Sequence, residues 1–172
     1  QSALLESMQE KQVTIGDDSY KLDLPFLVLA TQNPIDQEGT YPLPEAQRDR
    51  FMMKLNVDYP SKEEELKIMQ RMSDLNFKKS TKTILNKKDI TAIQNEINKV
   101  SISESIEKYI IEIVNATRKP SSVKLNEFED YISFGASPRA SINLSLASKA
   151  NAFLSNRDYV MPDDVKEIAH DF

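Results

Sequence analysis

Three polar residues in this chain stand at positions that suit the handling of phosphate. Asn33 follows the apolar run 26–30 and precedes Pro34. We expect it near the carboxyl end of a buried strand, where ligands bind in open α/β sheets. A neutral amide there can orient a water or contact a phosphate. Because Asn-Pro is also a common start of a turn, a purely structural role for Asn33 fits the spacing equally well.

Arg50 lies between Asp49 and Phe51, near the expected C-terminal end of a short helix. A cation is favourable at that end of any helix because it complements the helix dipole. A surface arginine paired with Asp49 or Glu45 is therefore the alternative to a phosphate contact. Arg48 competes with Arg50 for the functional assignment, and the local sequence does not decide between them.

Arg139 follows Ser137 and Pro138, which suit the N-cap and the first position of a helix. A cation in the first helical turn opposes the helix dipole, at a cost of about 0.3–1 kcal/mol. A guanidinium beside free backbone N–H groups is suited to an anion. The alternative is a solvated arginine that the helix start tolerates.

The chain contains no recognisable cradle for a phosphate and no predicted metal site. Its three glycines, Gly16, Gly39 and Gly135, are too far apart to form a Gly-rich phosphate loop. Cysteine is absent, and the one histidine is His170. An isolated histidine is a poor metal ligand, so the sequence predicts none.

The composition is that of a globular protein rather than a nucleic-acid or membrane protein. Of the 172 residues 40% are hydrophobic and 28% are charged, and the net charge is −5. Nucleic-acid binders usually carry a basic face, and none is evident here. No apolar run approaches the roughly 18 residues of a membrane span, and no signal peptide is visible. We therefore expect a cytoplasmic location, with neither nucleic acid nor membrane as a partner.

The elements that must position these residues change in character near residue 60. Before it, residues 13–15 and 20–22 predict a β-hairpin. The continuously apolar run 26–30 predicts a strand of a parallel sheet, covered on both faces, and 54–57 a further strand. Pro44 is expected to open the short helix that precedes Arg50.

After Pro60 the pattern is helical, with a loop-like stretch at 119–136. The expected helix starts are Ser61 with Glu64, Asn86 with Asp89, Ser101 with Glu104, Ser137 with Pro138, and Pro162. The apolar residues expected on these helices are, in chain order, Leu66, Ile68, Met69, Ile90, Ile93, Ile97, Ile106, Ile110, Ile113, Val114, Ile142, Leu146, Ala150, Phe153, Val165, Ile168 and Ala169. Those of the fourth helix, from Ile142 to Phe153, are expected to face inward.

Taken together, these residues resemble the MoxR family of AAA+ ATPases. The resemblance rests on segments 1–10, 12–16, 30–34, 37–47, 49–51 and 135–140. It implies an α/β plus all-α chain in two parts. Residues 1–59 would be the C-terminal part of an AAA+ core with a β-hairpin, lacking Walker A and Walker B, which should lie upstream of Gln1. Residues 60–172 would be a helical lid, truncated at its C-terminus.

The resemblance also implies a role for each of the three polar residues. Asn33 looks like sensor 1, and Arg50 looks like an arginine finger that acts on a neighbouring subunit's ATP. Arg139 looks like sensor 2, in cis or in trans. The intact protein would use ATP and Mg²⁺, whereas this fragment, without the main phosphate and metal contacts, is expected to bind neither and to be inactive.

The function that the resemblance implies is ATP-driven, chaperone-like remodelling of partner proteins by a ring, typically a hexamer. Family members often work with VWA-domain partners. Two alternatives stay open. One is another motor of the same helix-insert clade, of DNA-translocating or chelatase type. The other is an interaction module that has lost catalysis.

Overall fold

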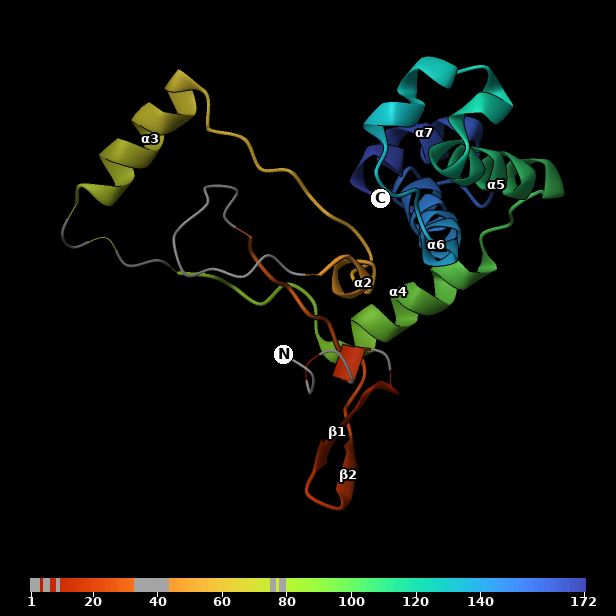
Figure 1. Ribbon diagram of the computed structural model, residues 1–172. Coiled ribbons are helices and arrows are strands. Elements are labelled where there is room, and N and C mark those ends of the chain that lie inside the picture. Colours follow the sequence, from red (N-terminus) through yellow and green to blue (C-terminus); the bar gives the residue numbers. More distant parts are fainter. Residues whose placement is uncertain (1–3, 5–6, 9, 33–43, 75–76, 78–79) are drawn as a thin grey trace.

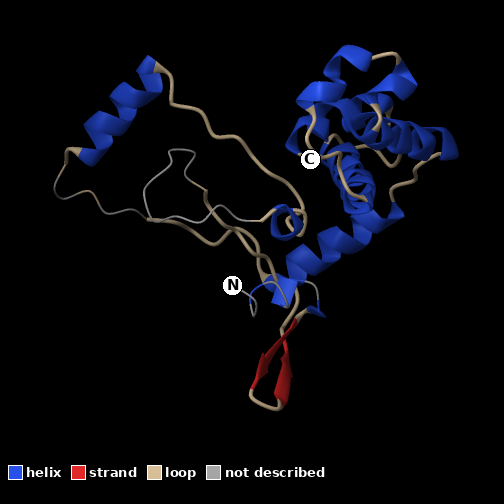
Figure 2. Ribbon diagram, in the orientation of Figure 1, coloured by secondary structure: helices blue, strands red, loops and turns tan. Residues whose placement is uncertain are grey.

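A computed structural model describes the chain except for residues 1–3, 5–6, 9, 33–43, 75–76 and 78–79 (Figure 1). The α-helices are α2 (Glu45–Arg48), α3 (Lys62–Met72), α4 (Lys87–Lys99), α5 (Glu104–Arg118), α6 (Pro138–Leu154) and α7 (Pro162–Ile168). The 3-10 helices are η1 (Pro120–Val123), η2 (Asn126–Tyr131) and η3 (Ala169–Asp171). The strands are β1 (Gln12–Ile15) and β2 (Asp18–Lys21), which project from the rest of the chain (Figure 2).

The hydrophobic core lies in the C-terminal half, where α5, α6 and α7 pack together (Figure 1). Its buried members are Val100, Ile106, Ile110, Leu144, Ala152, Val160 and Val165. A short parallel bridge between Ser101 and Tyr159 joins the segment before α5 to the segment before α7. Of the apolar positions predicted for the third and fifth helices, Ile106, Ile110, Val114 and Val165 are confirmed as buried. The other predicted positions, Ile113, Ile168 and Ala169, are partly buried and pack against the core.

Local capping signals placed most helix starts correctly. Ser61 and Glu64 form a capping box at α3, and Asn86 and Asp89 form one at α4. Pro162 occupies the first turn of α7. The predicted start at Ser101 was wrong by two residues: Ser103 precedes α5, because Ser101 is held in the bridge with Tyr159.

The buried face of α6 differs from the prediction. Leu144, Ala147, Ser148 and Ala152 are buried on this helix. Ile142 is 61% exposed and Leu146 is 44% exposed, so their predicted inward positions were wrong. The apolar residues of α6 are distributed around the whole helix. Their periodicity therefore does not predict which face packs against α5 and α7.

Helix α3 forms as predicted but packs little of its apolar face. Leu66 and Ile68 are each 50% exposed, and Met69 is 59% exposed. The capping box and the three glutamates of the first turn stabilise this helix locally. Its apolar residues contribute little to the core described above.

The predicted hairpin is confirmed. Val13 pairs with Tyr20, and Ile15 pairs with Asp18, in an antiparallel register. Gly16 turns the chain with a φ of +64°, a conformation that glycine adopts without steric cost.

The two predicted parallel strands are extended but unpaired within the described residues, where β1 and β2 form the one sheet. A strand needs a neighbouring strand for its backbone hydrogen bonds, and these segments find none there. Leu29 is 86% exposed and Val57 is 91% exposed. The Lys54 amide instead donates to the Asp171 carbonyl at 2.8 Å.

None of the described helices is long and apolar enough to cross a bilayer.

Candidate functional site

Arg139 lies in the first turn of α6, after the N-cap Ser137 and the first residue Pro138, as predicted. The Ser137 hydroxyl accepts a hydrogen bond from the Arg139 amide at 3.1 Å, and Pro138 occupies the first turn. The Arg139 side chain thus belongs to the first turn of α6, where the Arg139 and Ala140 amides both donate to Ser137. Its side chain is about half exposed, at 48%, so it is accessible to an anion from solvent.

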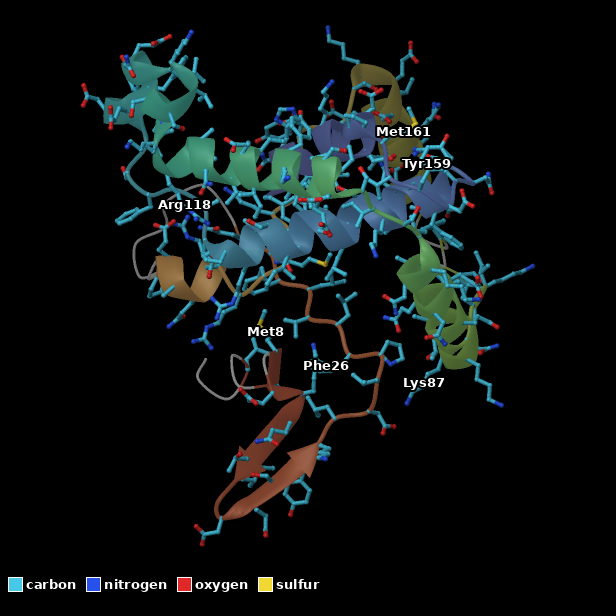
Figure 3. All side chains as sticks on the ribbon, turned by 90° about the vertical axis from the view of Figure 1, so that its right-hand side faces the viewer. Met8, Phe26, Lys87, Arg118, Tyr159 and Met161 are labelled. Carbon is cyan, nitrogen blue, oxygen red and sulfur yellow. The ribbon has the colours of Figure 1, made fainter. Side chains whose placement is uncertain are left out.

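The loop before α6 is clamped onto the end of α5. Ala136 donates its amide to Thr117 Oγ1 at 2.9 Å, and its carbonyl accepts from Arg118 Nε at 2.6 Å. Gly135 makes this approach possible, because a Cβ there would lie 2.5 Å from the Arg118 Cα. Figure 3 shows Arg118 at the place where α5 and α6 meet. Thr117 and Arg118 thus position the start of α6, a role that the sequence analysis missed.

The turn after α2 meets Arg139. Asp49 Oδ2 accepts from Arg139 Nη1 at 2.5 Å, although the two residues are 90 positions apart. The Asp49 side chain is 26% exposed. Figure 3 shows α2 beside the N-terminal end of α6. The structure therefore brings two of the predicted regions together, the 49–51 turn and the start of α6.

Arg50 lies in the same turn and is partly buried. Its amide donates to the Gln47 carbonyl at 3.4 Å. Nearby, Glu45 pairs with Arg48 at 3.3 Å, and Asp49 pairs with Arg139. Arg48 is an exposed residue in a local pair, whereas Arg50 is less exposed and adjoins the Arg139 contact.

Asn33 lies outside the described residues, so the structure does not place it relative to Arg50 or Arg139. The expected roles of Asn33, Arg50 and Arg139 stay predictions.

A second arginine–aspartate pair on the lid is structural in character. Arg157 binds Asp164 through two hydrogen bonds, at 2.7 and 2.5 Å, and the Met161 amide donates to the same carboxylate at 2.7 Å. Asp164 is 2% exposed. The Arg157 hydrogen bonds lower the pKa of Asp164 despite burial, which acts in the opposite direction. This pair holds α7 against the segment that precedes it. Both residues follow the C-terminal end of α6, whereas Arg139 lies at its N-terminal end.

The described residues fit part of a nucleotide–metal site. Arg139 already holds a carboxylate oxygen at the start of a 17-residue helix, so its position suits an anionic oxygen. For Mg²⁺, in contrast, the part of the chain that the structure describes contains no cluster of three or more His, Cys, Asp or Glu residues that could hold a metal.

Comparison with known proteins identifies the family of the chain. Residues 1–53 match the family model "ATPase family associated with various cellular activities (AAA)", and residues 127–171 match "AAA lid domain". The Chaperone MoxR1 of Mycobacterium tuberculosis is 46% identical over 99% of this chain and 45% of its own length. The chain belongs to the MoxR family of AAA+ ATPases. The Protein MoxR of Paracoccus denitrificans is 29% identical over 96% of this chain and 51% of its own.

A solved structure extends the MoxR likeness to three dimensions. The crystal structure of a protein proposed to be an ATPase, from Cytophaga hutchinsonii, is 62% identical, with a TM-score of 0.90, over 99% of this chain and 52% of that one. The fold class is thus confirmed as AAA+ core segments followed by a helical lid. The chain spans about half the length of the MoxR relatives it matches.

Proposed function

We propose that the chain supplies the sensor and arginine-finger side of an ATP site in a MoxR-type ATPase. The observation that carries this proposal is the contact between the first turn of α6 and the 49–51 turn, through Arg139 and Asp49. Two arginines that the family resemblance assigns to phosphate thereby lie on adjoining segments. Arg139 would serve as sensor 2 and Arg50 as the arginine finger, with Asn33 as sensor 1.

Each arginine would act through its charge and its position. In-line phosphoryl transfer requires little covalent chemistry from the protein, so positioning and electrostatic stabilisation dominate catalysis. Arg139, fixed by Ser137 and by the clamp on Ala136, would orient toward the phosphate oxygens. Arg50 would reach the ATP of a neighbouring subunit, and its guanidinium would stabilise charge there. ATP supplies the phosphoryl group, and Mg²⁺ neutralises charge on its oxygens.

In the whole protein, residues 1–59 would complete an α/β core and residues 60–172 would form its lid. The exposed apolar side chains of 26–30 and 54–57 support this division, because strands of a parallel sheet are normally buried on both faces. Because the Walker A and Walker B motifs that the family resemblance implies are not in this half, we expect it alone to be inactive and to bind ATP weakly or not at all.

The wider role that we propose is ATP-driven, chaperone-like remodelling of partner proteins by a ring, in the cytoplasm. The curated relative from Mycobacterium tuberculosis is called a chaperone. A hexameric ring and VWA-domain partners are the finer parts of this proposal. The arginine finger itself requires assembly, since it serves a neighbouring subunit.

The test is turnover by the full-length protein carrying Arg50→Ala. We expect ATP binding to persist while kcat falls by about 10³-fold or more, the effect of removing an arginine finger in related phosphoryl transfer. Arg48→Ala is the matched control, because Arg48 is exposed and pairs locally with Glu45. Turnover that survives in Arg50→Ala but is lost in Arg48→Ala would move the finger to Arg48.

A further inference from the structure

The carboxylate of Asp49 forms an ion pair with the guanidinium of Arg139, the group that we propose contacts phosphate. Arg139 Nη1 and Asp49 Oδ2 form a charge-assisted hydrogen bond with a distance of 2.5 Å. This ion pair links the α2 turn to α6. Arg139 is therefore held by an anion of the protein itself.

We infer that Asp49 is a positioning residue that holds Arg139 until a nucleotide phosphate competes for it. This inference rests on the proposed function, which makes Arg139 the phosphate contact. The pair is partly exposed, with side-chain accessibilities of 48% for Arg139 and 26% for Asp49, so water and ions screen it. A terminal phosphate carries more charge than one carboxylate, so it attracts the Arg139 guanidinium more strongly. The phosphate can thus displace Asp49.

Displacement of Asp49 affects the turn that carries the proposed finger. Asp49 and Arg50 are consecutive, and the turn is closed by hydrogen bonds from Asp49 N to Glu45 O at 3.0 Å and from Phe51 N to Arg48 O at 3.0 Å. While Arg139 holds Asp49, this turn is tied to the lid. When a phosphate binds Arg139, the ion pair between Asp49 and Arg139 is broken. Phosphate binding at Arg139 is thereby coupled to the position of Arg50.

The experiment measures binding of the non-hydrolysable analogue AMP-PNP to the full-length protein by calorimetry. Removal of the competing charge in Asp49→Asn should tighten binding by about twofold to fivefold, the range of a partly exposed ion pair. Arg139→Gln should weaken binding. The double variant should bind like Arg139→Gln, because Asp49 acts only through that guanidinium. Glu45→Gln, which removes a carboxylate of the same helix that pairs with Arg48, should leave the affinity unchanged.

The direction in which Asp49→Asn changes the AMP-PNP affinity distinguishes competition with phosphate from a purely structural role of Asp49. A carboxylate that merely stabilises the fold would, once removed, leave binding unchanged or weaker, and either result overturns the inference. Asp49→Ser is the second variant, and failure of both to fold would show that Asp49 is structural. If Arg139→Gln binds normally, the proposed sensor role of Arg139 fails instead. If Arg139→Gln weakens binding while Asp49→Asn does not tighten it, only the competition fails.

Discussion

Gly135 lies so close to Arg118 that a Cβ at position 135 would be 2.5 Å from the Arg118 Cα and 2.8 Å from its amide nitrogen. This close approach, together with the two hydrogen bonds of Ala136 to Thr117 and Arg118, sets where α6 begins. The first turn of α6 presents Arg139. A residue without a side chain therefore determines the placement of a charged one four positions later.

Gly135→Ala should destabilise the lid by about 1–3 kcal/mol, because backbone atoms of Arg118 must move to admit the methyl group. Denaturant unfolding followed by circular dichroism measures the change. Ser133→Ala, at an exposed position of the same loop, is the control and should change the free energy of unfolding by less than about 0.5 kcal/mol. Equal stability of the two variants would show that the loop relaxes freely.

Asp164→Ala should cost about 3 kcal/mol, because it removes a buried carboxylate that satisfies both Arg157 and the Met161 amide. Asp163→Ala is the neighbouring control. The side chain of Asp163 is 81% exposed and contacts Lys166 at only 3.4 Å, so its loss should be close to neutral. Thermal unfolding of the two variants provides the comparison, and similar losses would argue against a specific role for the Arg157–Asp164 pair.

The stability of the fold should depend on pH through the carboxylate of Asp164. Hydrogen bonds from Arg157 lower the folded-state pKa of Asp164 below its ordinary value of 3.8. The stabilisation is therefore fully present above that value and is lost as the pH falls through the lower, folded-state pKa. The difference in unfolding free energy between the wild type and Asp164→Asn should be constant from about pH 7 to pH 5 and narrow below 3.8. A difference that narrows already near neutral pH would contradict this assignment.

Leu144→Ala tests the buried face of α6, which sequence periodicity did not identify. Leu144 is 1% exposed, so its truncation leaves a cavity and should cost about 2–5 kcal/mol. Leu154→Ala on the same helix is the control, since Leu154 is 77% exposed. In chemical denaturation, the free energy of unfolding of Leu144→Ala should be much lower than that of Leu154→Ala. The value for Leu154→Ala should stay within about 0.5 kcal/mol of the wild-type value.

Amide hydrogen exchange should separate the lid core from the unpaired extended segments. Residues 106–114 of α5 lie on buried helix turns and should exchange slowly in this chain. The described amides of 26–30 and 55–57 should exchange faster, because neither segment belongs to a sheet. Mass spectrometry of peptides from each region gives the comparison, and slower exchange in the extended segments would contradict it.

The sequence by itself determined the elements whose signals are local. A capping box such as Ser61 with Glu64 joins residues three apart, and the Gly16 turn joins adjacent strands. Such contacts form between near neighbours whatever surrounds them, so residue type and spacing predict them. The family resemblance was equally readable, because it lies in contiguous motifs.

Only the tertiary structure decided which distant residues meet. Nothing in the sequence around Asp49 or Arg139 specifies their contact across 90 positions, or the approach of Gly135 to Arg118. The inward face of α6 and the unpaired state of 26–30 and 54–57 likewise depend on partners elsewhere in the chain. Packing and strand pairing are satisfied between elements rather than within them, and a periodic pattern shows that a surface can be buried but not what buries it.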